Sequence, residues 1–123
     1  MIIIDYSDKR PIYEQIVERF QTLIVSGIME ADEKLPSVRT LAVELSINPN
    51  TIQRAYTELE RDGFIYTVKG RGNFVKKDEA LLEKQREKLL TELEQQIHIC
   101  LRQGIRKDEL LSRVEKAAKE VEA

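Results

Sequence analysis

The chain has 123 residues, of which 41% are apolar and 34% are charged, a balance typical of a soluble globular protein rather than a disordered one. Its single cysteine, Cys100, excludes an internal disulfide framework and favours a reducing cytoplasm. No apolar run approaches the roughly 18 residues of a membrane span, and the short apolar start before Asp5 is not typical of a secretory signal. We therefore expect a cytoplasmic protein without a membrane partner.

The formal net charge of −2 is unusual for a nucleic-acid binder, but the charges are unevenly distributed. Residues 1–33 carry three basic and seven acidic side chains, whereas residues 34–76 carry seven basic and four acidic ones. The remaining residues, with ten basic and eleven acidic side chains, are almost neutral. A local basic excess is the electrostatic footprint of nucleic-acid binding, so residues 34–76 are the candidate binding segment.

The first predicted helix starts at Pro11, where the missing proline N–H does no harm, and it stops at Gly27. Its apolar residues have helical spacing and predict one buried face. They are Ile12, Ile16, Phe20, Leu23 and Ile24, widened by Tyr13 and Val17. Residues 28–34 are typical of a loop. A second, shorter helix is predicted after Ser37, which is a favourable N-cap residue.

A third helix is predicted to start at Pro49, with Asn48 as its cap and Asp62-Gly63 as its end. Its apolar stripe has the spacing i, i+3, i+4, i+7 and consists of Ile52, Ala55, Tyr56 and Leu59. Two helices this short, joined by a tight turn, indicate a helix-turn-helix.

The opposite face of that third helix is polar and consists of Asn50, Gln53, Arg54 and Thr57. Asn and Gln each offer a donor and an acceptor to a base edge, and Arg bridges a guanine or a phosphate. The pattern favours a recognition helix over residues 49–62, presented to the major groove by its N-terminus. The alternative is an ordinary solvated helix face.

A β-hairpin is predicted next, with strands at residues 64–68 and 73–75. Its tip, Lys69-Gly70-Arg71-Gly72, combines cations with glycines that allow a close approach to a narrow groove. Ser37 and Arg39, in the first turn of the second helix, are placed for phosphate contacts. A basic turn is often only a turn, but the order of helix, turn, polar-faced helix and basic hairpin favours a wing at residues 65–75.

Two further helices are predicted after Lys77, interrupted at Gly104. An exposed apolar stripe would be a liability in a monomer, so these helices predict a homodimer contact. The candidate contact residues are Leu82, Leu89, Leu90, Leu93, Ile97, Leu101, Leu110, Leu111 and Val114. The alternative is that the second tail helix and the winged domain cover the stripe within one chain.

Nothing in the chain predicts catalysis, a metal site or a cofactor. The single histidine, His98, lies about 200° around its helix from Cys100, so the two cannot act as a pair. Gly70-x-Gly72 lacks the third glycine and the following helix of a nucleotide-binding fingerprint. We expect no enzymatic activity.

Four motifs resemble those of GntR-family transcription regulators. They are PIYEQI at 11–16, LPSVRTLA at 35–42, NPNTIQRAYTELERDGFI at 48–65 and KGRGNFV at 69–75. The resemblance implies a winged helix-turn-helix that binds an operator as a dimer, most often as a repressor. The DNA-facing positions that it implies are Arg39, Asn50, Thr51, Gln53, Arg54, Lys69, Gly70, Arg71 and Gly72. Pro49 departs from the pattern, since some members carry a basic residue there, and the short tail is similar to that of the YtrA-type subfamily.

The sequence thus predicts a mainly α fold with a small β-hairpin. Residues 1–76 are expected to form a winged helix-turn-helix DNA-binding domain and residues 77–123 a two-helix dimerisation region. The expected partners are a palindromic double-stranded operator and a second copy of the chain, with the operator sequence and any small-molecule effector left open. The alternative function is a protein-interaction module that uses a winged fold without binding DNA.

Overall fold

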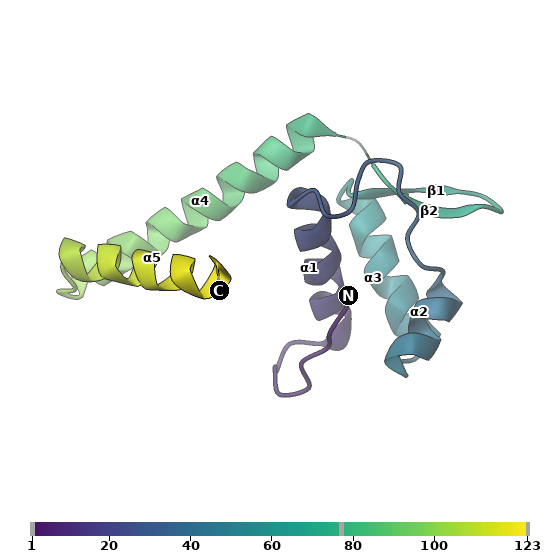
Figure 1. Cartoon of the computed structure of the whole chain (residues 1–123), viewed down its shortest axis with the longest axis horizontal. Coiled ribbons are helices and arrows are strands. Elements are labelled where there is room, and N and C mark those ends of the chain that lie inside the picture. Colours follow the sequence, from purple (N-terminus) through teal and green to yellow (C-terminus); the bar gives the residue numbers. More distant parts are fainter. Residues whose placement is uncertain (1, 77, 123) are drawn as a thin grey trace. The chain divides into compact units, whose positions relative to one another are not determined.

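A computed structural model describes residues 2–76 and 78–122, and these fall into two compact units, Met1–Leu82 and Glu83–Ala123. The first unit contains α1 (Ile12–Val25), α2 (Val38–Leu45), α3 (Pro49–Arg61) and a β-hairpin (Figure 1). The second unit contains most of α4 (Glu79–Arg102) and all of α5 (Lys107–Glu122). The predicted mainly α fold, with an N-terminal winged helix-turn-helix and two C-terminal helices, is confirmed.

The core of the first unit forms where α1 packs against α3. Ile16 and Phe20 of α1 are fully buried, as are Ile52 and Leu59 of α3. The Phe20 ring meets the Tyr56 ring edge to face, with centroids 5.6 Å apart. Both predicted apolar stripes therefore face each other, and the helical period of the sequence fixes which side of α3 points away from the core.

The two helix starts follow the predicted capping chemistry. The Ser37 Oγ accepts the Thr40 N–H at 3.0 Å, and the Asn48 Oδ1 accepts the Asn50 N–H at 2.8 Å, with Pro49 in the first turn of α3. Between the helices, Ser46 adopts the left-handed conformation with φ of 54°, and its N–H bonds to carbonyls of α2. A single non-glycine residue in this region is enough to turn the chain sharply.

The hairpin consists of β1 (Ile65–Val68) and β2 (Gly72–Val75), paired antiparallel with Ile65 opposite Val75. Residues 32–35, which belong largely to the segment predicted as a loop, run along the free edge of β2. Their backbone bonds join the Asp32 N–H to the Val75 carbonyl at 2.8 Å and the Leu35 N–H to the Asn73 carbonyl at 2.9 Å. The loop prediction missed this pairing because it uses backbone groups alone and leaves no alternating side-chain pattern.

The second unit has no buried side chain among its described residues. α4 ends in a Schellman motif, in which the Ile105 N–H bonds to the Cys100 carbonyl and Gly104 adopts φ of 91°. At its other end, α4 begins inside the first unit, where Leu81 and Leu82 pack against the core. The first compact unit thus runs past residue 76; Lys77, with which the tail was predicted to begin, lies outside the described residues. No helix in the described part of the chain is long and apolar enough to cross a membrane.

Candidate nucleic-acid interface

The outer face of α3 is polar and open. Asn50, Gln53, Arg54 and Thr57 are all exposed, and Thr51 is half-buried at the edge. The Gln53 Nε2 donates to the Thr57 Oγ1 at 3.3 Å, which links the two side chains and leaves the Gln53 carbonyl oxygen free of that bond. This face therefore offers both donors and acceptors in a fixed row, which is the chemistry needed to recognise base edges.

The cap residues Ser37 and Asn48 lie at the exposed starts of α2 and α3. The Ser37 hydroxyl accepts from the Thr40 N–H and donates to the Thr40 Oγ1 at 2.8 Å, so its single donor is engaged. Asn48 uses its oxygen for the cap, and its amide N–H₂ remains available as a donor. Both predicted site residues therefore have a structural role in the helices that carry the interface.

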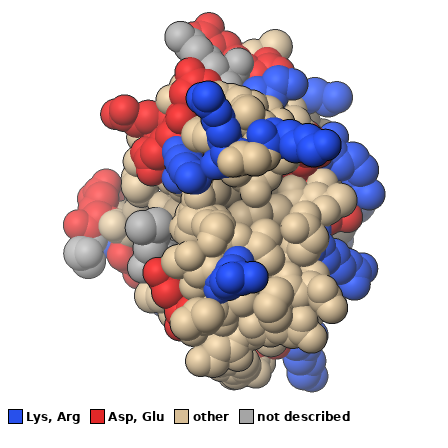
Figure 2. Space-filling model, turned by 90° about the vertical axis from the view of Figure 1, so that its right-hand side faces the viewer, with Lys and Arg blue, Asp and Glu red and all other residues tan. Residues whose placement is uncertain are grey.

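Three cations predicted to meet DNA are exposed: Arg39 on α2, and Lys69 and Arg71 at the hairpin tip. Among the described residues, none of them takes part in an ion pair, in contrast to Arg61, which bonds to Glu58 at 2.8 Å. Figure 2 shows the side of the molecule toward which the hairpin points, with most Lys and Arg in its upper part and along the right edge, and Asp and Glu mostly at the top and on the left. Because no carboxylate among the described residues neutralises these three side chains, their positive charges are available to bind phosphates.

The hairpin tip is shaped by its glycines. Gly70 adopts φ of 79°, a Cβ added to it would meet no atom within 4 Å, and the Arg71 N–H closes the turn onto the Val68 carbonyl at 2.9 Å. Gly72 has a different role, because a Cβ there would lie 3.0 Å from the Cε of Lys34. Gly70 therefore leaves open space at the tip, while Gly72 leaves room for the Lys34 side chain.

Side-chain contacts hold the hairpin to the rest of the first unit. The Thr67 hydroxyl lies within hydrogen-bond distance of the Glu60 carboxylate of α3 and of the Asn73 Oδ1 across the hairpin, and its one proton serves either acceptor. Tyr66 stacks on Phe74 with centroids 5.6 Å apart and donates its hydroxyl to the Asp32 carboxylate at 2.8 Å. That hydrogen bond, together with some loss of solvation, raises the pKa of Tyr66 above its ordinary value. The hairpin is thus joined to α3 through Thr67 and to the segment before α2 through Tyr66.

A further tether joins α3 to the segment before α2. The Tyr56 hydroxyl donates to the Pro36 carbonyl at 2.7 Å. Burial, and to a lesser degree the charge of Glu44, raises the pKa of Tyr56 above its ordinary value. This bond thus joins α3 to the start of α2.

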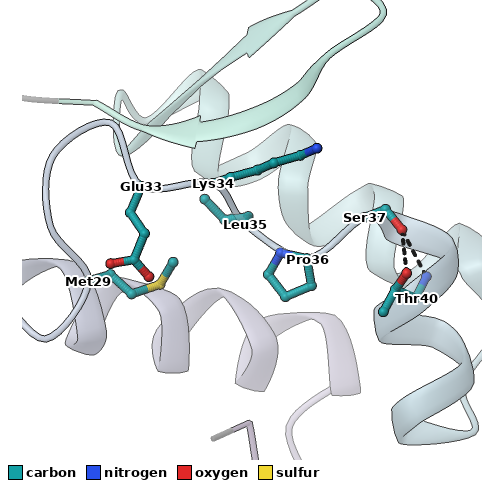
Figure 3. A pocket seen from close by; sticks show the side chains of 7 residues that line it. All are labelled: Met29, Glu33, Lys34, Leu35, Pro36, Ser37 and Thr40. Atoms are coloured by element: carbon teal, nitrogen blue, oxygen red, sulfur yellow. Dashed lines mark hydrogen bonds between the residues drawn. The ribbon is translucent and has the colours of Figure 1, made fainter.

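Lys34 is a cation that the sequence did not single out. It lines a surface pocket of about 530 Å³ beside the start of α2, together with Met29, Glu33, Leu35, Pro36, Ser37 and Thr40 (Figure 3). Lys34 is bridged to Phe74 of β2, and its side chain extends past Gly72 below the hairpin. It therefore lies between α2 and the wing. The one feature of the sequence that could have indicated Lys34 is its position as the first residue of the basic segment, residues 34–76.

Arg54 has a partner that the sequence did not reveal. Its guanidinium carbon lies 3.7 Å from the centre of the Tyr13 ring of α1. Tyr13 was predicted only as an apolar residue that widens the α1 stripe, and it is indeed half-buried against the core. No local pattern could have found this pair, because the two residues are far apart in the sequence.

Most of the candidate dimer residues on α4 and α5 are exposed. Leu93, Leu111 and Val114 are 52%, 54% and 60% exposed, and Leu89, Leu90 and Leu101 are exposed as well. Ile97 and Leu110 are half-buried. Leu82 differs from the others, because it is half-buried against the core of the first unit.

In this unit a tight turn joins two helices, the second helix has a free polar face, and a basic hairpin follows it. This arrangement defines a winged helix-turn-helix transcription regulator. The family model described as "Bacterial regulatory proteins, gntR family" matches residues 12–75. The chain belongs to this GntR family, as its motifs predicted.

Individual relatives extend this result. The HTH-type transcriptional repressor YtrA of Bacillus subtilis (strain 168) is 51% identical over 75 residues, which are 61% of this chain and 58% of the repressor. The chain thus spans little more than half the length that YtrA has. A GntR family transcriptional regulator from Listeria monocytogenes has a solved structure with a TM-score of 0.77 and 43% identity, covering 92% of this chain and 98% of its own.

The DNA-binding domain of AraR, solved in complex with operator ORR3, has a TM-score of 0.53 and 29% identity, covering 59% of this chain and 88% of its own. The similarities are consistent with the YtrA-type subfamily. The relatives are transcription regulators and not enzymes, which agrees with a non-enzymatic role.

Proposed function

We propose that this regulator is a repressor that binds a palindromic DNA operator as a homodimer in the cytoplasm. The observation that carries the proposal is the two-sided character of α3, which is buried through Ile52 and Leu59 and open through Asn50, Gln53 and Thr57. A helix of this kind enters the major groove with its polar face toward the base edges.

The exposed cations contact the DNA at two further places. Arg39, near the start of α2, contacts a phosphate at the edge of the major groove, and Lys69 and Arg71, at the hairpin tip, enter the adjacent minor groove. Lys34 lies between them and adds a fourth positive charge to the same surface. The operator complex of the AraR domain, which shares this fold, supports DNA as the partner.

The exposed apolar side chains of α4 and α5 support a dimer. Leu93, Leu111 and Val114 expose more than half of their surface, and α4 and α5 bury none of their described residues. Fully burying an exposed Leu or Val contributes roughly 1.5–3 kcal/mol. Each of these side chains would contribute the part of that value that belongs to its remaining exposed surface, and a stripe of them together drives association. A two-fold dimer presents two copies of α3 and therefore requires an operator with matching symmetry.

The test is the salt dependence of binding to duplex DNA, measured by fluorescence anisotropy on a duplex that the parent selects from a random pool. Arg39→Ala removes a phosphate contact, and Arg71→Ala removes a positive charge from the hairpin tip in the minor groove, between the two phosphate backbones. Each variant is therefore expected to bind more weakly and to reduce the magnitude of the slope of log K against log salt by about 0.9. Arg106→Ala is the matched control, because Arg106 is also exposed but lies in the tail and pairs with Asp108.

Parent-like binding by both Arg39→Ala and Arg71→Ala would overturn the assignment of this surface. Absence of any duplex binding by the parent, with salt-insensitive capture of a protein instead, would favour the interaction-module alternative.

A further inference from the structure

The guanidinium of Arg54 is held in place by α1, a helix with no predicted contact to DNA. Its central carbon lies 3.7 Å from the centre of the Tyr13 ring, which is close contact for a cation over an aromatic face. Tyr13 itself is anchored, because it packs against the core and its hydroxyl donates to the Glu14 carboxylate at 3.3 Å. The ring is thus a fixed platform for a side chain of the recognition helix.

This contact differs in kind from the ion pairs that Arg10 and Arg61 of the first unit make. Arg10 bonds to Asp8 and Glu18, and Arg61 bonds to Glu58, so carboxylates neutralise both. Within the described residues Arg54 has no ion pair. An aromatic face covers one side of the guanidinium plane and leaves its charge and its in-plane N–H donors available.

We propose that Tyr13 is a positioning residue for DNA binding, which orders Arg54 in advance so that its guanidinium meets the phosphate backbone beside the recognition helix. This inference rests on the proposed function. Arg54 stands on the flank of the polar face, on the side of α3 where the Tyr13 ring of α1 lies. A free arginine loses rotamer freedom when it binds, and a side chain already held by a ring loses less.

The role of α1 in this account is indirect, since Tyr13 itself does not touch DNA. The pair also links the core to the interface, because Tyr13 belongs to the same stripe of α1 as Ile16 and Phe20. A residue of α1 can therefore set the geometry of a DNA contact that a side chain of α3 makes.

The experiment is a double-mutant cycle on full-length protein, with Tyr13→Leu, Arg54→Ala and the double variant, bound to a duplex that the parent selects from a random pool. Tyr13→Phe is the conservative control, because it keeps the ring and removes only the hydroxyl. Affinity and its salt slope are measured well below the unfolding temperature of every variant, so that folded protein alone is compared.

Tyr13→Leu is expected to weaken binding about two- to five-fold, the range of an exposed cation–π contact, and Tyr13→Phe is expected to bind like the parent. In the Arg54→Ala background, Tyr13→Leu should cause no further loss. Equal losses in both backgrounds, or a loss in Tyr13→Phe as large as in Tyr13→Leu, would overturn the inference while leaving the proposed function intact. A parent that binds no duplex at all would overturn both.

Discussion

At the scale of single residues, Asn48 shows how one side chain serves both the fold and the interface. Its Oδ1 accepts the Asn50 N–H at 2.8 Å and so satisfies one of the free donors at the start of α3. The same position is exposed at the end of α3 that enters the groove in the proposed complex. The demands on the residue are therefore separable: folding needs an acceptor, and DNA binding needs the absence of negative charge.

Asn48→Asp is expected to separate these demands. An aspartate caps a helix as well as an asparagine does and suits the positive end of the helix dipole, so thermal stability should stay at or slightly above that of the parent. DNA binding should weaken roughly fivefold, because a new negative charge about 4 Å from a phosphate is repelled by about 1 kcal/mol in water.

Asn48→Ala is the comparison, and it should lose about 1 kcal/mol of stability through the missing cap. Thermal unfolding and anisotropy measure the two effects. An aspartate variant that binds DNA as tightly as the parent would place the start of α3 away from the phosphates.

At the scale of elements, local signals in the sequence predicted most of the first unit. The caps at Ser37 and Asn48, the glycine after α1 and the turn at Lys69–Gly72 all have short-range chemistry that can be read from neighbouring residues. The contacts that were missed are long-range ones: residues 32–35 along β2, Lys34 beside Gly72, and Tyr13 beneath Arg54. These contacts depend on how the helices and strands pack against one another, and the local periodicity of apolar residues does not reveal that packing.

The wing is the element whose attachment responds to pH. Tyr66 donates to Asp32, and the raised pKa of Tyr66 means that the folded protein favours the protonated phenol. The stabilisation is therefore fully present below the ordinary tyrosine pKa of about 10 and is lost as pH rises through the higher folded value.

Tyr66→Phe keeps the stack on Phe74 and removes the hydrogen bond. We expect this variant to unfold at a lower temperature than the parent at pH 7, and the difference should shrink above about pH 10, where the parent phenol ionises. Circular dichroism melts over that pH range measure it. A difference that stays constant to pH 11 would mean that the Tyr66–Asp32 bond does not contribute to stability.

At the scale of the whole molecule, the two units differ in how they bury apolar surface. The first has a closed core built from α1, α2, α3 and the hairpin. The second exposes its leucines, although their spacing puts Leu89, Leu93 and Ile97 on one face of α4. That contrast is the physical reason to expect the second copy of the chain at the tail and the DNA at the first unit.

Leu93→Glu is expected to convert the proposed dimer into a monomer, because it places a charge in the apolar stripe of both copies at once. Thr91→Glu adds the same charge to the same helix but on its other side, so it should stay dimeric. Sedimentation equilibrium reports the mass, and the monomeric variant should also bind a palindromic duplex more weakly. A dimer that survives Leu93→Glu would move the contact away from this stripe.

Residue-resolved NMR of ¹⁵N-labelled protein, titrated with a selected duplex, tests whether the outer face of α3 and the hairpin tip meet duplex DNA. We expect the largest amide shifts at Asn50, Gln53, Thr57, Gly70 and Arg71, while the buried side of α3 around Ile52 and Leu59 changes little. Shifts that gather on another surface, with these five amides unmoved at saturation, would contradict this expectation.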